Sequence, residues 1–163
     1  MKTKQWILLA EDDEHIAELT MLALGSPDKV FLARDGLEAL DCLYHRGLRP
    51  GGWPDDNPAV VLLDLKMPKV NGIEVLRQIK SDPRLKNIPV VMLTSSREES
   101  DLQRTYDLGA NAYVVKPVEF HAFNEAIKTT CRFWLTMNET PRETAKDVPA
   151  RPSFQRSAGA VPA

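Results

Sequence analysis

The sequence has few of the residues that would place it among disulfide-rich, thiolate-metal or membrane proteins. Its two cysteines, Cys42 and Cys131, lie far apart and form no CxxC or Cys/His pattern, so we interpret them as reduced core thiols. The first apolar run, residues 6–10, is five residues long, which is too short for a signal-peptide core or a membrane span. These absences predict a cytoplasmic protein with no membrane partner.

An excess of charge of one sign is also missing. The formal net charge is -2, which leaves no basic footprint for nucleic acid. A length of 163 residues is enough for one domain and little else. Nothing repeats internally, and the three histidines, His15, His45 and His121, are scattered without a suitable partner group. We therefore expect neither a nucleic-acid partner nor a histidine phosphodonor in this chain.

Short apolar runs alternate with amphipathic segments along the chain. The run at residues 60–63, Val-Val-Leu-Leu, has no polar alternation, which is typical of a strand buried on both faces of a parallel sheet. The segments between the runs carry apolar residues at helical spacing, as Ile73, Leu76 and Ile79 do. This alternation predicts an α/β fold, a doubly wound parallel sheet with helices on both faces and right-handed crossovers. The expected strands are residues 6–10, 30–33, 60–63, 89–93 and 112–115.

Two helices have readable ends. Ser96 and Glu99 have the spacing of a capping box, which predicts the start of the fourth helix, and Gly109 should stop it. The last helix should run over about residues 118–135. One stripe of this helix is assigned to the core: Phe120, Phe123, Ile127, Cys131 and Trp134.

Two segments show no periodic pattern. Residues 46–58 hold three glycines and three prolines, and we expect a surface loop longer than the usual connection of about two to six residues. Trp53 inside it is either an exposed contact or a lid on the core, and we favour the lid. Residues 139–163 contain several prolines and few large apolar groups, which predicts a disordered tail. The folded domain should therefore span residues 1–138, and the tail offers no material for a DNA-binding output domain.

Polar side chains follow four of the five expected strands. A parallel sheet brings the carboxyl ends of its strands to one edge, where ligands bind in open α/β sheets. Any one of these side chains also has a plain structural reading, as a helix cap, a helix-dipole partner or a solvated loop residue. Their joint occurrence favours a site. The set consists of Glu11 and Asp12 after the first strand, Asp64 after the third, Thr94 after the fourth and Lys116 after the fifth.

Carboxylates gathered at one edge need positive charge. Two of them about 4 Å apart repel by about 4 kcal/mol at an effective dielectric of 20. Lys116 supplies one positive charge, and oxygen ligands of this kind suit Mg²⁺. Mg²⁺ at a phosphate site would let Asp64 attack a phosphoryl group in line, with Thr94 and Lys116 on its oxygens. The sequence therefore predicts Asp64 as a nucleophile that forms an aspartyl phosphate.

These residues resemble the receiver domain of bacterial two-component response regulators, over about residues 5–135. The resemblance implies a flavodoxin-like (βα)5 sheet with strand order 2-1-3-4-5 and a sensor histidine kinase as the phosphodonor. Asp64 matches the phosphoacceptor and Lys116 the phosphate-binding lysine, with a cis bond to Pro117. The matching motifs are LLAEDD (8–13), LLDLKMP (62–68), NG (71–72), MLTS (92–95) and GANAYVVKP (109–117).

The resemblance also implies roles for the remaining site residues. Glu11 and Asp12 match the acidic pair that positions Mg²⁺, and the backbone carbonyl of Lys66 a further metal ligand. Thr94 and Tyr113 match the switch pair of the family. Some members have Asp where this chain has Glu11, so the longer side chain changes the geometry of the metal and its waters. Such a chain is a switch that catalyses at most its own phosphorylation and slow dephosphorylation, and not a metabolic enzyme.

A nearer resemblance comes from the end of the last helix. Single-domain regulators that partner bacterial phytochrome histidine kinases have similar letters at RFWL (132–135), in the polar segment after it and at DGLEAL (35–40).

Phosphorylation of Asp64 should draw Thr94 and Lys116 inward, let Tyr113 fill the vacated space and alter the face of the fourth helix, fifth strand and fifth helix. Phe133 either seals a homodimer through this face or caps the core.

Two other functions fit parts of the pattern. An aspartate-nucleophile phosphatase of the haloacid dehalogenase type typically has a second acid two residues after the nucleophile, whereas this chain has Lys66 there. A phosphate-independent interaction module would need a broken acidic pair or a missing lysine, and both are intact. The phosphoacceptor switch is the function that the sequence predicts.

Overall fold

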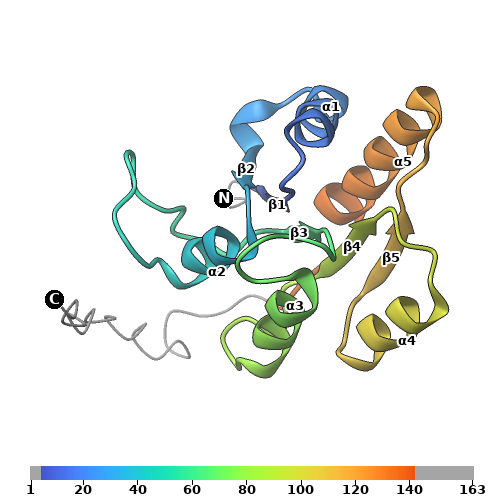
Figure 1. Ribbon diagram of the computed structural model, residues 1–163. Coiled ribbons are helices and arrows are strands. Elements are labelled where there is room, and N and C mark those ends of the chain that lie inside the picture. Colours follow the sequence, from blue (N-terminus) through green and yellow to red (C-terminus); the bar gives the residue numbers. More distant parts are fainter. Residues whose placement is uncertain (1–4, 142–163) are drawn as a thin grey trace, which may run out of the picture.

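The structure, a computed structural model, describes residues 5–141 and has one parallel sheet at its centre (Figure 1). The five strands lie in the order β2-β1-β3-β4-β5, and every pairing is parallel. This confirms the predicted fold class and strand order. The strands are β1 (Ile7–Ala10), β2 (Val30–Ala33), β3 (Val60–Leu63), β4 (Val90–Thr94) and β5 (Ala112–Val115).

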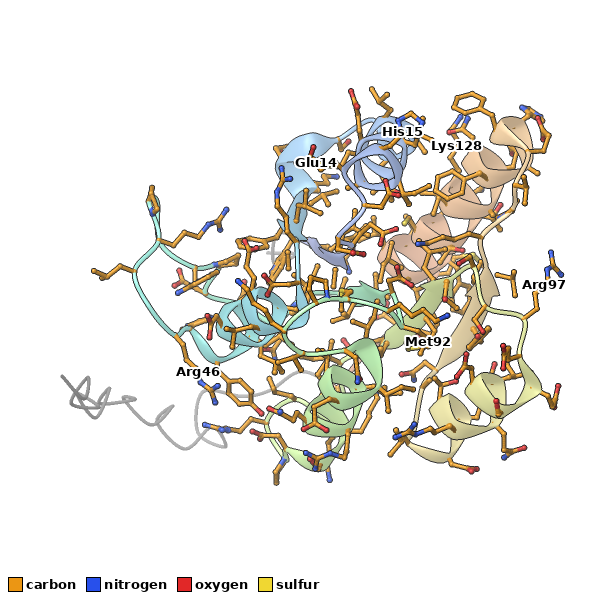
Figure 2. The ribbon with its side chains drawn as sticks, in the orientation of Figure 1. Glu14, His15, Arg46, Met92, Arg97 and Lys128 are labelled. Carbon is orange, nitrogen blue, oxygen red and sulfur yellow. The ribbon has the colours of Figure 1, made fainter. Side chains whose placement is uncertain are left out.

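The helices cover both faces of the sheet. In Figure 1, α1 and α5 lie side by side on one face, and α2, α3 and α4 lie on the other. Glu14 and His15 mark α1 and Lys128 marks α5 in Figure 2. The helices are α1 (Glu14–Leu24), α2 (Gly36–Tyr44), α3 (Gly72–Ser81), α4 (Glu99–Asp107) and α5 (Phe120–Arg132), with a 3₁₀ turn η1 (Pro27–Lys29) before β2 and a π-helix η2 (Phe133–Met137) after α5.

The apolar runs of the strands fill two cores, one on each side of the sheet. The residues of β1, β3 and β4 are buried throughout, as the lack of alternation predicts. Leu8, Val61 and Met92 point into the core below α2 and α3, and Ile7, Leu62 and Val91 into the core below α1 and α5. Both cysteines are buried, Cys42 in the first core and Cys131 in the second, which confirms them as core thiols.

Short polar side chains begin three of these helices. Asp13 caps α1, Asp35 caps α2 and Asn71 caps α3, each by accepting hydrogen bonds from backbone N–H groups of the first turn. At α2, Glu38 also accepts a hydrogen bond from the backbone N–H of Arg34, the residue before the cap. These caps fix where each helix leaves the carboxyl end of the preceding strand.

The segment at residues 46–58 is a surface loop, as predicted. Trp53 packs against the core, with its ring 5.6 Å from that of Phe31, so the lid interpretation is confirmed. The Arg49 guanidinium lies 3.7 Å from the centre of the Phe31 ring. By contrast, Leu48 at the tip of the loop is fully exposed.

Several local expectations are wrong. Ser96 does not cap α4, because the helix begins only after Glu98, which provides no side-chain cap, and the Ser96 hydroxyl instead accepts from Glu98 N at 3.3 Å and donates to Asp101. Phe120 is 64% exposed, because it stands at the first turn of α5 before the helix reaches the sheet. No cis peptide bond occurs in the described residues, so the bond before Pro117 is trans, the isomer that is favoured by about 0.5–1 kcal/mol before proline.

The C-terminal part of the expected last helix changes its hydrogen-bonding pattern. α5 ends at Arg132, and η2 continues the chain to Met137 with a hydrogen bond from Asn138 N to Phe133 O. Trp134 packs against the core, as expected. Residues 139–141 form no helix or strand, and the rest of the expected disordered tail lies outside the described residues. In the part of the chain that the structure describes, no helix is long and apolar enough to cross a membrane.

Candidate functional site

The carboxyl ends of the strands bring the predicted acidic residues together. Glu11 and Asp12 directly follow β1, and Asp64 directly follows β3, which is the neighbouring strand. Backbone hydrogen bonds continue this pairing past the strands, with Asp64 N donating to Ala10 O at 3.1 Å. One carboxylate oxygen from each of Glu11, Asp12 and Asp64 lies within 4.8 Å of the other two. The three acids predicted from the sequence therefore form one cluster.

Lys116 joins this cluster from the end of β5. Its ammonium donates hydrogen bonds to Glu11 Oε1 and, at 3.2 Å, to Asp64 Oδ2. The side chain is 11% exposed, so the charge pair is shielded from solvent. Lys116 N also donates to Thr94 O at 2.8 Å, which ties the ends of β4 and β5 together.

The four carboxylates that follow β1 have different partners. Asp13 accepts hydrogen bonds from the backbone of α1, and Glu14 forms an ion pair with Arg34 at 2.7 Å. Asp13 and Glu14 are therefore used in capping and at the surface. Glu11 and Asp12 instead lie beside Asp64, so they are not the helix-dipole partners that the alternative interpretation made them.

Glu11 is the carboxylate of the cluster whose surroundings most disfavour its charged form. It is 2% exposed, and its Oε2 has no hydrogen-bond partner among the described residues. Burial and the neighbouring Asp64 raise the pKa of Glu11 to about 8, while Lys116 acts in the opposite direction. A buried oxygen without a donor, next to two more carboxylates, is a fit for a hard divalent cation such as Mg²⁺.

Each oxygen of the Asp64 carboxylate has a hydrogen-bond donor. Its Oδ1 accepts a hydrogen bond from Leu65 N at 2.8 Å, and its Oδ2 faces Lys116. Its side chain is 13% exposed, and that of Asp12 beside it is exposed, so the cluster opens to solvent. The side chain of Lys66, two residues further, is also exposed.

Thr94 and Tyr113, the predicted switch pair, are connected through Ser96, which the sequence predicted to be a helix cap. Ser96 N donates to Thr94 Oγ1 at 3.2 Å, and the Tyr113 hydroxyl donates to Ser96 O at 3.0 Å. The Ser96 hydroxyl donates to Asp101 of α4 at 2.6 Å. Burial raises the pKa of Tyr113, so it is a neutral donor. Thr94, Tyr113 and α4 are thus linked by Ser96, whose serine-acid spacing in the sequence indicated only a cap.

Two glycines allow close backbone contacts near the cluster that sequence reasoning did not identify. A side chain at Gly72 would lie 1.9 Å from the backbone oxygen of Asp64, and one at Gly36 would lie 1.8 Å from that of Val70. Gly72 N donates to Leu65 O at 2.8 Å. The dipeptides Asp-Gly and Asn-Gly were the sequence signal for these contacts, because only glycine allows another backbone to approach so closely.

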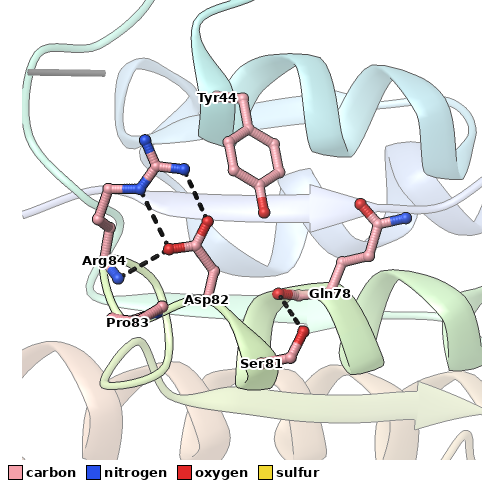
Figure 3. A pocket seen from close by; sticks show the side chains of 6 residues that line it. All are labelled: Tyr44, Gln78, Ser81, Asp82, Pro83 and Arg84. Atoms are coloured by element: carbon pink, nitrogen blue, oxygen red, sulfur yellow. Dashed lines mark hydrogen bonds and ion pairs between the residues drawn. The ribbon is translucent and has the colours of Figure 1, made fainter. Parts of the chain in front are cut away.

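Two pockets flank these regions. One of about 430 Å³ is lined by residues after β3, beginning at Leu65, and by α4, and includes Lys66 and Asp101. Another of about 450 Å³ lies at the opposite edge of the sheet, where α2 and α3 end (Figure 3). It contains Tyr44 and the Asp82–Arg84 ion pair, and none of the clustered acids.

Phe133 is 43% exposed, and its ring meets that of Trp134 edge-on at 4.9 Å. It therefore does not cap the core as a buried residue.

Arg97, in the loop before α4, extends into solvent from the same side of the molecule as β5 (Figure 2).

Comparisons with known proteins agree with this geometry. Residues 7–128 match the response regulator receiver domain. The chain is 43% identical over 138 residues to the probable methanogenesis regulatory protein FilR2 of Methanothrix harundinacea, which covers 83% of this chain and 86% of that protein. It is 36% identical over 132 residues to the response regulator Rcp1 of Synechocystis, with 79% and 88% covered.

Solved structures give the same picture. The bacteriophytochrome response regulator AtBRR is 54% identical, with a TM-score of 0.64 over 83% of this chain and 98% of that one. The phosphorylated cyanobacterial phytochrome response regulator RcpA is 38% identical, with a TM-score of 0.77 over 85% and 99%. Rcp1 has been solved in its Mn²⁺-bound form, with 34% identity and a TM-score of 0.76 over 85% and 99%.

Proposed function

Because this chain belongs to the response regulator receiver family, the switch modules of two-component signalling, we propose that Asp64 is its phosphoacceptor. The observation that supports this most directly is the cluster of Glu11, Asp12 and Asp64 within 4.8 Å with Lys116 hydrogen-bonded to Asp64. A nucleophile, a cation-binding acid pair and a fixed ammonium are the parts that phosphoryl transfer needs.

The reaction follows from these positions. A kinase phosphohistidine presents its phosphorus to Asp64, the P–N bond to the imidazole breaks, and a P–O bond to Asp64 forms. Lys116 and the Thr94 hydroxyl hold phosphoryl oxygens as charge builds on them. Glu11, Asp12, Asp64 and the backbone carbonyl of Lys66 would hold Mg²⁺, which would neutralise charge on the phosphoryl group when bound. Water later hydrolyses the aspartyl phosphate to Asp64 and inorganic phosphate.

The partner that we infer is a bacteriophytochrome-type histidine kinase. The support is the similarity to AtBRR and RcpA, whose names state a phytochrome connection. We infer a cytoplasmic location from that partnership. Transfer of label from a purified phosphorylated bacteriophytochrome kinase to this chain, compared with transfer from an unrelated histidine kinase, tests the assignment. Equal rates from both donors would contradict it.

The output that we propose is a change in the face formed by α4, β5 and α5. Ser96 carries a hydrogen bond to Thr94, to Tyr113 and to Asp101 of α4, so a movement of Thr94 toward the phosphoryl group acts on all of them. The exposed Phe133 would then join two copies of the chain. Light scattering with and without beryllofluoride tests the dimer, and a monomer in both states would contradict it.

The experiment that tests the phosphoacceptor is labelling with a small phosphodonor and Mg²⁺. Intact-mass measurement should show one added phosphoryl group on the wild type and none on Asp64→Asn. Asp55→Asn, an exposed aspartate in the loop at residues 46–58, is the matched control and should label like the wild type. Label on Asp64→Asn at the wild-type yield would overturn the proposal.

A further inference from the structure

The segment between β3 and α3 holds an unusual backbone turn three residues after Lys66. Lys69 has a φ of 65°, in the left-handed region that residues other than glycine rarely adopt. Val70 N donates to Pro68 O at 2.8 Å, which closes a γ-turn centred on Lys69. The form of this turn with positive φ is rare and strained. Strain of this kind persists where surrounding contacts enforce it.

The contacts that enforce the turn come from the start of α2. Lys69 Nζ forms an ion pair with Asp35 Oδ2 at 3.2 Å, and the Asp35 side chain is 13% exposed. The other oxygen of Asp35 accepts a hydrogen bond from Glu38 N at 2.8 Å, so the carboxylate is fixed to the helix. Next to it, Gly36 lies so close to Val70 that a side chain there would meet Val70 O at 1.8 Å. The turn is thus attached to α2 by one ion pair and one backbone contact.

The other end of the same segment is attached to α3. Gly72 N donates to Leu65 O at 2.8 Å, and the backbone of Gly72 approaches the carbonyl of Asp64 closely. Lys66 lies between these two attachments, and its own side chain is exposed. The position of its backbone therefore depends on the segment as a whole, not on packing of its side chain.

We propose that Asp35 and Lys69 form a brace that holds the segment carrying Lys66 in the conformation that binds Mg²⁺. The brace makes the first turn of α2 a positioning element for the metal site, although neither residue touches the clustered acids. This inference rests on the proposed function, in which the Lys66 carbonyl is a metal ligand.

A brace and a simple charge effect predict opposite results for one of two variants. Asp35→Asn keeps a side chain that caps α2 but removes the charge that Lys69 meets. Lys69→Met removes the opposite charge. A charge effect alone would weaken Mg²⁺ binding in Asp35→Asn and strengthen it in Lys69→Met, because the second variant loses a positive charge near the cation. Loss of the brace weakens binding in both.

The experiment is titration of the metal-free full chain with Mg²⁺ in a calorimeter. We expect the dissociation constant to rise about 3- to 10-fold in both variants. Arg34→Gln is the control, because it removes a positive charge from another exposed ion pair after β2 and leaves the segment untouched. Any pattern other than weakening in both variants and no weakening in Arg34→Gln would overturn the brace.

A second readout needs no metal. Amide hydrogen exchange of residues 65–72 in the presence of a chelator should be faster in Asp35→Asn and Lys69→Met than in the wild type, at an unchanged melting temperature. Unchanged exchange there would also overturn the brace. Failure of the proposed function looks different, because the wild type would then bind Mg²⁺ but accept no phosphoryl group on Asp64.

Discussion

The two edges of the sheet are built on opposite principles. At the edge formed by the carboxyl ends of the strands, one buried oxygen of Glu11 has no hydrogen-bond partner within residues 5–141, and Lys69 has a positive φ. At the edge formed by the amino ends, Lys80 Nζ donates hydrogen bonds to Lys86 O, Ile88 O and Asn111 Oδ1. One edge keeps unfavourable interactions that a ligand can relieve, and the other satisfies its buried polar groups.

The same contrast appears in how charges are paired. Lys116 meets two carboxylates of a cluster that contains a third, whereas Arg84 meets Asp82 in a two-bonded pair at 2.8 and 3.1 Å (Figure 3). A pair with complete hydrogen bonding stabilises a fold, and a crowded cluster stabilises a ligand. We conclude that the edge formed by the amino ends of the strands stabilises the fold, whereas the edge formed by their carboxyl ends is arranged to bind a ligand. Four predictions test this division.

The largest effect should come from Lys116. We expect Lys116→Met to lower the rate of phosphorylation by a small phosphodonor about 100-fold or more, because a fixed cation on the phosphoryl oxygens is lost. The rate is measured by intact-mass kinetics and normalised to folded protein by circular dichroism. Lys116→Arg keeps the positive charge in a different geometry, so its phosphorylation rate should lie between those of the wild type and Lys116→Met. A wild-type rate in Lys116→Met would remove this residue from the site.

Lys80 provides the matched lysine of the opposite edge. Lys80→Met should lower the free energy of unfolding by about 2 kcal/mol, because three oxygen acceptors lose their donor while the apolar stem is retained. Urea denaturation measures this loss. The phosphorylation rate of the folded fraction should equal that of the wild type. A slower rate would show that the two edges are coupled.

Mg²⁺ should stabilise the protein through the acidic cluster alone. At free Mg²⁺ ten times the dissociation constant, the free energy of unfolding should rise by about 1.4 kcal/mol. Asp12→Asn should lose this gain, and Lys80→Met should keep it. Thermal melts with a chelator and with Mg²⁺ measure the difference, and an equal gain in Asp12→Asn would contradict the assigned cluster.

The smallest effect should be a pH dependence at the amino-end edge. The hydrogen bonds from Arg84 lower the pKa of Asp82 to about 2, below its ordinary value of 3.8. A depressed carboxyl pKa contributes stability that is present above about pH 4 and is lost as the pH falls through about 2. We expect this contribution to be about 1 kcal/mol after solvent screening. Asp82→Asn should lack this part of the acid dependence in urea titrations, and an unchanged profile would contradict it.

Most of the sheet could be predicted because buried parallel strands leave a simple trace in the sequence. The expected bounds of β2 and β5 match the structure, and the acids after β1 and β3 meet because parallel strands end at one edge. The sequence did not predict the exposure of Phe120, since helical periodicity gives a face of α5 but not where that helix reaches the sheet.

The contacts that depend on three-dimensional approach also escaped prediction. Ser96 had the spacing of a cap, but α4 begins after Glu98, and spacing alone does not decide at which residue a helix starts. The brace between Asp35 and Lys69 joins residues that are distant in the chain, and nothing local to either residue indicates it. The isomer at Pro117 was carried over from a resemblance, and the structure has the trans form.

The loop at residues 46–58 has a use beyond the fold. Trp53 and Arg49 attach it to Phe31, while the tip at Leu48 stands clear of the remaining protein. A cysteine placed at Leu48 would therefore carry a fluorescent dye or a surface tether, while the two native thiols stay buried and react slowly. The chain thus offers a single labelling position for following its encounter with the proposed kinase partner in real time.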